Sequence, residues 1–386
     1  MEKLNKYFIK SFLFITLLAF TFASCSDDDD NNGSEQKLNL DKTGAFVLGE
    51  GKKGDNNAKL SHYSLSKYSF TGNVFEKQNK GLKLGNTAQD ILIYGGKAFI
   101  TVTNSDMLFV TDLDGVLLEE ISFAKTAYNQ PRFMVEDNGY VYIDFYSGHL
   151  VRLNTSTLKI DDSKDVLDLP ANPEQMAKAN GKLYITNSRK DKAEGKTLTV
   201  VNLSTFKKEA DIAVHVNPTR ITSDSKGNVY VLSWGDYTAT DNGKSALSVI
   251  KAGSDKAEVA KLGDAGTFMV MHDDKLIIAQ TVYDKDNNYY PITSYSQYDI
   301  SKVKTDLNEG WSDKSFFDVP ADKDAAQLLT EGYFMSVNPA NSDVYVSVSN
   351  YRVTGAVLIF DKEGKFKEHI PTGMVNTQKV AFMQGK

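Results

Sequence analysis

The stretch KGNVYVLSW at residues 226–234 places a turn glycine before an alternating apolar and aromatic run, which is typical of a buried β-strand. Similar stretches recur along the chain: TGAFVLGEG (43–51), GKAFITVTN (96–104), NGYVYIDFY (138–146), NGKLYITNS (180–188), DDKLIIAQT (273–281) and NSDVYVSVS (341–349). Their matching central residues are Phe46, Phe99, Tyr142, Tyr184, Tyr230, Ile277 and Tyr345. We interpret this periodicity as core packing and assign it no function.

Most copies follow one another at roughly 40–55 residues, close to the spacing of four-stranded propeller blades. Every copy except the first is preceded by another strand-like segment, such as PRFMVEDNG (131–139). A spare segment of this kind, NTQKVAFMQ (376–384), stands at the C-terminus, where it can pair with the first copy and leave no open edge. The sequence therefore predicts an all-β fold over residues 41–386, a seven-bladed β-propeller of four-stranded antiparallel blades with the ring closed by the C-terminal strand.

The gap before the last copy is longer than the others, and we interpret residues 302–330 within it as an insertion. An eight-bladed ring would require a further repeat hidden there, for instance around KSFFDVP (314–320).

Residues 1–24 have the pattern of a secretory signal peptide. Lys3, Lys6 and Lys10 precede an apolar run, SFLFITLLAFTFA (11–23), that is too short to span a bilayer. The junction Phe22-Ala23-Ser24-Cys25 resembles the lipobox of bacterial lipoproteins, which implies cleavage before Cys25 and acylation of that residue. The alternative is a signal peptide followed by an ordinary free cysteine. We expect membrane attachment through this lipid anchor only.

Residues 25–40 then form an expected flexible tether, because Asp27–Asp30 and the Asn-Asn-Gly-Ser that follows cannot bury apolar area. The acidic run resembles the export signal of Bacteroidetes surface lipoproteins, which implies the outer membrane with the protein facing the cell exterior. A plain linker is the alternative.

Charge and motif content narrow the classes of function. The formal net charge of −6 disfavours phosphate backbones, so we expect no nucleic acid partner. The five histidines are scattered, and no HExxH, P-loop, GxSxG or GxGxxG motif occurs in a suitable context. The run DKDNN (284–288) lacks the glycine and distal glutamate of a calcium loop. We therefore expect a protein that is not an enzyme and has no cofactor and no metal.

In a propeller, the loops that enter the innermost strands share one face with the loops between the second and third strands, and function usually lies there. Amide, aromatic and arginine residues recur in these loops: Asn86, Asn104, Gln130, Tyr146, Asn187, Arg220, Trp234, Tyr237, Tyr283, Tyr290, Tyr351 and Arg352. Aromatic rings cover ligand surface and carboxamides provide paired donors and acceptors. From this set we select as ligand-binding residues Asn86, Gln130, Asn187, Trp234, Tyr237, Tyr290, Tyr351 and Arg352.

Three stretches carry a family resemblance: FVLGEGKKGDNNAKLSHYS (46–64), GNTAQDILIYGGKAFITVTNSDMLFVTD (85–112) and NPTRITSDSKGNVYVLSWGDY (217–237). They resemble Bacteroidetes surface propeller lipoproteins that include the BtuG-like, vitamin B12-binding (YncE-like propeller) family. Glu50 and Gly51 match the family's Asn-Glu-Gly after the first strand, whereas Gly49 replaces its asparagine. The resemblance implies capture of cobalamin, or a related corrinoid, and delivery to a TonB-dependent outer-membrane transporter.

Other functions remain open from the residues alone. A glycan or other nutrient receptor would use nearly the same amide and aromatic groups, and an interaction scaffold would need no pocket. A propeller lactonase would require a calcium cluster at the axis, for which Glu50, Glu174 and Glu331 are the candidates.

Overall fold

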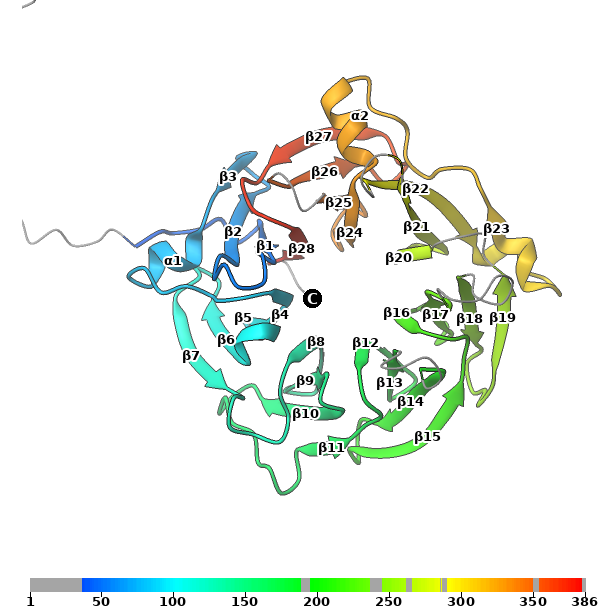
Figure 1. Ribbon diagram of the computed structural model, residues 1–386, viewed down its shortest axis with the longest axis horizontal. Coiled ribbons are helices and arrows are strands. Elements are labelled where there is room, and N and C mark those ends of the chain that lie inside the picture. The colour runs from blue at the N-terminus through cyan, green and yellow to red at the C-terminus, as the bar shows by residue number, and fades with distance from the viewer. Residues whose placement is uncertain are drawn as a thin grey trace, which may run out of the picture. The chain divides into compact units, whose positions relative to one another are not determined.

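The computed structural model describes residues 37–188, 195–236, 245–261, 266–284, 286, 290–349 and 354–383. Residues Leu38–Lys386 make up one compact unit. Its described residues form seven four-stranded antiparallel sheets, arranged as blades around a central axis (Figure 1). The prediction of a seven-bladed β-propeller is therefore confirmed.

Each blade takes one strand from each of four concentric rings. The innermost strands are β4 (Ala88–Tyr94), β8 (Pro131–Asp137), β12 (Pro173–Ala179), β16 (Pro218–Ser223), β20 (Gly266–His272), β24 (Gly332–Val337) and β28 (Thr377–Phe382). The second strands are β1 (Ala45–Gly49), β5 (Lys97–Val102), β9 (Tyr140–Phe145), β13 (Lys182–Asn187), β17 (Val229–Ser233), β21 (Lys275–Asp284) and β25 (Val344–Val348). The third strands are β2 (Lys59–Ser64), β6 (Met107–Asp112), β10 (His149–Asn154), β14 (Thr197–Asn202), β18 (Ala246–Ile250), β22 (Tyr290–Asp299) and β26 (Ala356–Phe360). The outermost strands are β3 (Ser69–Thr71), β7 (Leu117–Ser122), β11 (Val166–Asp168), β15 (Lys207–Ala213), β19 (Ala257–Lys261), β23 (Trp311–Ser312) and β27 (Phe366–Pro371).

Blade one joins the two ends of the propeller, because its strand order is β28-β1-β2-β3. Ala45 pairs with Phe382 and Leu48 with Lys379, so the C-terminal strand lies beside the first one (Figure 1). The predicted ring closure is confirmed. Blades two to seven follow in chain order, β4–β7 through β24–β27.

The repeated central residues of the second strands lie in the core, as expected. All seven are buried, with Phe46, Phe99 and Ile277 fully inaccessible to solvent. Apolar clusters join the blades; for example, Phe46 and Leu48 of blade one share a cluster with Ile91 and Ile100 of blade two. Burial of each such side chain contributes about 1.5–3 kcal/mol, which makes the ring a rigid support for its loops.

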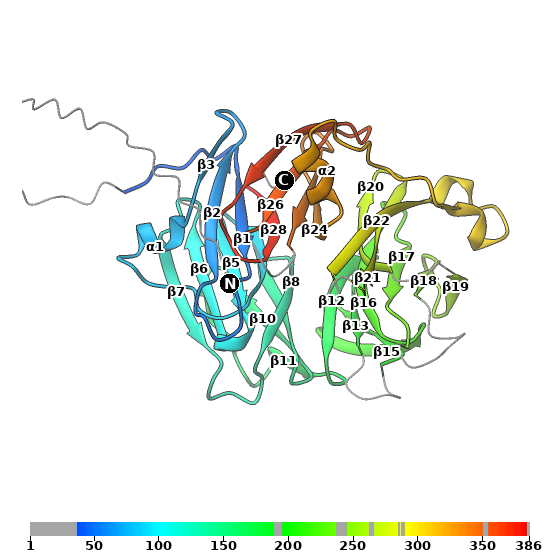
Figure 2. The ribbon, with the colours of Figure 1, turned by 45° about the horizontal axis from the view of Figure 1, so that its top comes forward.

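The segment 302–330 is more than an insertion. It contains β23, which pairs with β22 and completes blade six, and the short helix α2 (Lys323–Leu329). Asp322 caps this helix by accepting a 2.8 Å hydrogen bond from the Ala325 N–H, and Ala325 and Leu329 belong to the core cluster of blade seven. Figure 2 shows α2 beside the strands of this blade. No eighth blade occurs among the described residues.

The remaining helices are short: α1 (Val74–Gln78) and the 3₁₀ turns η1 (Thr103–Ser105), η2 (Ile300–Lys302) and η3 (Leu307–Gly310). Across the described residues, no helix has the length and apolar character needed to cross a membrane. Cys25, Asp27–Asp30 and the signal-like segment lie outside the described residues.

Candidate functional site

The innermost strands begin with an irregularity in every blade. Their pairing to the second strand omits the second residue, as between Ala88 and Asp90 in blade two; in blades three and four it also omits the third residue and one residue of the second strand. The skipped second residues are Gln89, Arg132, Glu174, Thr219, Thr267, Tyr333 and Gln378. A bulge of this kind redirects a side chain, so each blade offers one of these residues near the axis.

A second set of positions follows the second strands. There the backbone N–H donates to the carbonyl of the residue that precedes the innermost strand, as from Glu50 to Asn376 (2.8 Å) and from Trp234 to Asn217 (2.9 Å). Asn376 and Asn217 have positive φ values, a conformation that asparagine tolerates better than most residues. These bonds hold Glu50, Trp234 and the equivalent Ser349 at the same end of the axis.

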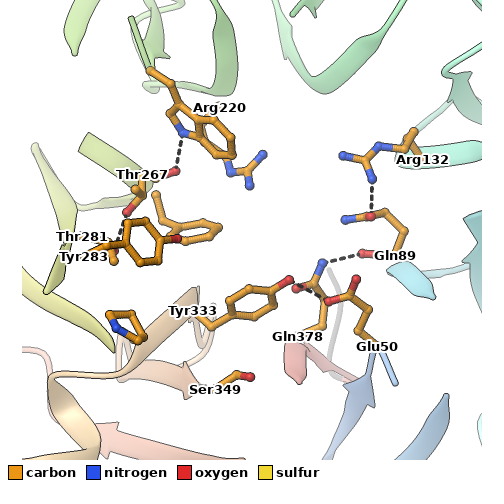
Figure 3. A pocket seen from close by; sticks show the side chains of 14 residues that line it. Glu50, Gln89, Arg132, Arg220, Thr267, Thr281, Tyr283, Tyr333, Ser349 and Gln378 are labelled. Atoms are coloured by element: carbon orange, nitrogen blue, oxygen red, sulfur yellow. Dashed lines mark hydrogen bonds between the residues drawn. The ribbon is translucent and has the colours of Figure 1, made fainter. Parts of the chain in front are cut away.

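The two sets enclose a pocket of ≈ 450 Å³ on the axis (Figure 3). Blades one, two, three, five, six and seven supply its lining: Glu50, Gln89, Arg132, Arg220, Trp234, Thr267, Phe268, Thr281, Tyr283, Pro291, Gly332, Tyr333, Ser349 and Gln378. Aromatic faces and a few converging polar groups are the usual composition of a small-molecule site.

Arg132 is anchored by a buried carboxylate of blade four. Its Nη2 donates to Glu174 Oε2 (2.5 Å), its Nη1 donates to Gln89 Oε1, and its guanidinium lies 4.1 Å from the centre of the Tyr146 ring. Tyr146 donates in turn to Glu174 Oε1 (2.7 Å). Burial acts to lower the pKa of Arg132, but the charge and hydrogen bond of Glu174 together with Tyr146 and Asp144 outweigh it, so the net pKa is raised. Arg132 is therefore a fixed cation.

Arg220 lies beside the Arg132–Glu174 ion pair, and its own positive charge is less well compensated. Its Nη1 is 3.9 Å from Glu174 Oε2, and its guanidinium lies 4.8 Å from the Phe268 ring and 5.4 Å from the Trp234 ring. Burial lowers its pKa, and the nearby charge of Arg132 acts in the same direction.

The opposite side of the pocket carries Glu50. Its Oε2 accepts a 2.6 Å hydrogen bond from the Tyr333 hydroxyl, and burial raises its pKa despite this bond and the charge of Arg132. Next to it, Gln378 Nε2 donates to the Gln89 carbonyl (3.1 Å), which links the innermost strands of blades one and two.

The wall between blades five and six is formed by Trp234 and a row of threonines. Trp234 Nε1 donates to the Thr267 carbonyl (3.0 Å), and the Thr267 and Thr281 hydroxyls are 3.0 Å apart. Tyr283 stands at the rim with 60% of its surface exposed.

Of the eight selected ligand-binding residues, Trp234 lines the pocket. Tyr290 does not line the pocket and donates to Glu331 Oε1. Tyr237, Tyr351 and Arg352 lie outside the described residues.

The three selected amides do not line the pocket, because each serves a loop or a blade. Asn86 Oδ1 accepts from the backbone N–H groups of Gly54 and Asn56 (3.1 and 2.8 Å). Gln130 occupies a turn with φ 58°. Asn187 is buried inside blade four, where its Nδ2 donates to Thr199 Oγ1 (2.9 Å).

Sequence reasoning selected none of Gln89, Arg132, Tyr333 and Gln378. Their position in the repeat was the signal that could have found them. Each is the second residue of an innermost strand, in the dipeptides Ala-Gln, Pro-Arg, Gly-Tyr and Thr-Gln. Arg220 and Tyr283 belonged to the wider loop set and do line the pocket.

The three glutamates considered for a calcium cluster each accept a hydrogen bond from a tyrosine hydroxyl: Glu50 from Tyr333, Glu174 from Tyr146 and Glu331 from Tyr290. Within the described ranges, no group of three or more His, Cys, Asp or Glu side chains could hold a metal ion.

A family model described as "Domain of unknown function (DUF5074)" matches residues 43–372. The chain belongs to the DUF5074 family. No curated protein matches it significantly.

Solved structures share the fold of this DUF5074 propeller at low identity. A quinonprotein alcohol dehydrogenase-like protein from Bacteroides thetaiotaomicron is 13% identical with a TM-score of 0.59, over 89% of this chain and 79% of that one. Hydrazine synthase of Kuenenia stuttgartiensis is 11% identical with a TM-score of 0.58, over 74% and 86%. The Pan2 WD40 domain of Neurospora crassa is 8% identical with a TM-score of 0.52, over 76% and 79%. At these identities the likeness concerns the fold alone.

Proposed function

We propose that this DUF5074 propeller captures a small organic molecule in its axial pocket and acts as a binding protein rather than an enzyme. The observation that carries the proposal is the convergence of six blades on one cavity of ≈ 450 Å³, lined by Trp234, Phe268, Tyr283 and Tyr333 together with two arginines. Pockets for drug-sized ligands have volumes of about 300–1,000 Å³ and the same mixture of apolar faces and few polar groups.

The polar groups of the pocket support binding because they hold one another in place. Glu174 fixes Arg132, and Tyr333 donates to Glu50, so both arrangements are formed before any ligand arrives. A pre-formed site loses less conformational entropy when it binds.

Cobalamin or a related corrinoid is our proposed ligand, in line with the resemblance of residues 46–64, 85–112 and 217–237 to the BtuG-like family. A corrinoid macrocycle is broad, so we place it across the mouth against the exposed Tyr283 ring, with one peripheral side chain inside the cavity. A glycan is the second candidate, because aromatic rims beside hydroxyl and amide groups also suit sugars.

The proposal extends to the cell surface. Acylation of Cys25 would anchor the chain in the outer membrane, and the Asp27–Asp30 run would direct it outward, above a TonB-dependent transporter that accepts the ligand. Lipid modification and transfer to this partner are parts of the same proposal.

Calorimetric titration of the full chain with cobalamin and with a panel of glycans tests the ligand. Tyr283→Ala should weaken binding by about tenfold or more, because it removes an aromatic face at the rim. Tyr68→Ala is the matched control, since Tyr68 is 73% exposed and does not line the pocket. Binding unchanged by Tyr283→Ala would exclude this site, and no heat with cobalamin would exclude the corrinoid.

A further inference from the structure

The two arginines of the pocket share one carboxylate unequally. Arg132 Nη2 is 2.5 Å from Glu174 Oε2, whereas Arg220 Nη1 is 3.9 Å from the same oxygen. The other oxygen of Glu174 accepts from Tyr146. Glu174 therefore compensates Arg132 well and leaves Arg220 with only a distant counter-charge.

Arg220 is also short of hydrogen-bond acceptors. Its side chain is only 9% exposed, and its Nη1 donates to the Thr219 carbonyl at 3.1 Å. Its Nε is buried and has no hydrogen-bond partner among the residues that the structure describes. An unpaired donor on a buried charge is costly, which favours an acceptor from outside the protein.

The residues around Arg220 indicate the chemical character of the molecule that would carry this acceptor. Its guanidinium lies near the Phe268 and Trp234 rings and points toward the cavity (Figure 3). The ring centres of Phe268 and Tyr333 are 5.8 Å apart. These rings offer flat apolar faces beside a planar cation.

We propose that Arg220 recognises a carboxylate on the ligand, whose flat apolar body lies against Phe268, Trp234 and Tyr333. This inference rests on the proposed capture of a small molecule in the axial pocket. It does not rest on cobalamin, whose peripheral groups are amides, and it favours a ligand that carries a free carboxylate. A carboxylate matches the planar fork of a guanidinium and can accept two parallel hydrogen bonds.

The charges of the pocket favour a single negative charge. Arg132 and Arg220 face the single carboxylate of Glu174, which leaves one positive charge uncompensated. Glu50 lines the opposite wall, where burial raises its pKa and so disfavours its charged form. One carboxylate balances Arg220, whereas a doubly charged phosphate would bring a surplus negative charge close to Glu50 and Glu174.

Matched acid and amide probes test the inference. We would titrate the full chain by calorimetry with indole-3-acetate and indole-3-acetamide, and with 2-naphthoate and 2-naphthamide. Each acid should bind about tenfold or more tightly than its amide, and Arg220→Met should weaken binding of the acids far more than binding of the amides and so abolish that preference.

Arg152→Met is the matched control. Arg152 is also an arginine between rings, with its guanidinium 4.4 Å from Phe206 and 4.8 Å from Tyr140, but it pairs with Asp165 and does not line the pocket. The acid preference should survive this change.

If Arg220→Met does not fold, judged by its thermal unfolding, Arg220→Lys replaces it. Lysine keeps the charge and loses the fork, so the preference should fall without vanishing. An undiminished acid preference in the variant that folds, or equal binding of acid and amide by the wild type, would overturn the carboxylate inference and leave the pocket as the binding site. Absence of heat with all four probes would also overturn it, while the proposed function is decided separately by the cobalamin and glycan titrations.

Discussion

The Tyr333 hydroxyl donates a 2.6 Å hydrogen bond to Glu50 Oε2, which joins blade seven to blade one across the closure of the ring. Tyr146 and Glu174 join blades three and four in the same way. These pairs place carboxylates at the axis and keep them oriented, so they connect the stability of the ring to the charge of its pocket.

The first prediction concerns the pH dependence of stability. Burial raises the pKa of Glu50 above its ordinary value of 4.5. The folded state therefore holds this proton more tightly than the unfolded state. The free energy of unfolding falls as pH rises from the unfolded pKa of about 4.5 through the raised pKa of the folded state. Glu50→Gln should be more stable than the wild type at pH 8 and similar to it at pH 4, as measured by urea unfolding.

Tyr333→Phe provides the paired test. It removes the hydrogen bond that lowers the pKa of Glu50, so that pKa should rise further and the loss of stability between pH 4 and pH 8 should grow. A Glu50→Gln variant less stable than the wild type at pH 8 would contradict this account.

The second prediction concerns ring closure. Deleting residues 377–386 removes β28 together with its buried Val380 and Ala381, and it exposes the edge of β1. The free energy of unfolding should fall by at least about 3 kcal/mol, and the variant should aggregate more readily. Removing only residues 384–386 keeps β28 and is the control. Equal melting temperatures for both truncations would exclude a stabilising role for β28.

The fold could be predicted because its signal is repeated. The buried second strands carry the alternating pattern around Tyr142 and Tyr230, and the innermost strands precede them at a nearly constant offset. Blade six was harder to predict, since its outer strand β23 has two residues and follows a long connection. Such a short strand has no periodicity of its own, so residues 302–330 resembled an insertion.

The site was predicted less well, for a physical reason. Loop composition pointed to the correct face and to Trp234, but Arg132 and Tyr333 belong to strands whose other residues build the core. Only the bulge at their second position turns these side chains to the pocket, and a bulge depends on how two strands pair. Asn187, by contrast, has the composition of a ligand contact but ends a buried strand.

The third prediction separates lipid attachment from surface display. Cys25→Ala should abolish acylation, measured by fatty-acid labelling, and should release the protein from the membrane fraction. Replacing Asp27–Asp30 with alanine should keep the lipid but protect the protein from protease added to intact cells. If this variant is still digested on intact cells, the acidic run is only a tether.

The last prediction uses the fact that the chain has two tryptophans. Trp311 lies in β23 at the outer edge of blade six, where its Nε1 donates to Asp313 Oδ1 (2.9 Å), whereas Trp234 lines the pocket. Trp311→Phe therefore leaves Trp234 as the single reporter. Cobalamin should change its emission in a saturable way, because the ligand displaces water beside the ring and adds a chromophore. Trp234→Phe keeps Trp311 as its only tryptophan. The emission of this variant should fall steadily as cobalamin is added, because the ligand absorbs light, and should show no saturation.

Trp234→Ala should weaken cobalamin binding by about thirtyfold, or ~2 kcal/mol, because it removes an aromatic wall that also lies against Arg220. A saturable change that follows Trp311 instead of Trp234 would place the ligand outside the axial pocket.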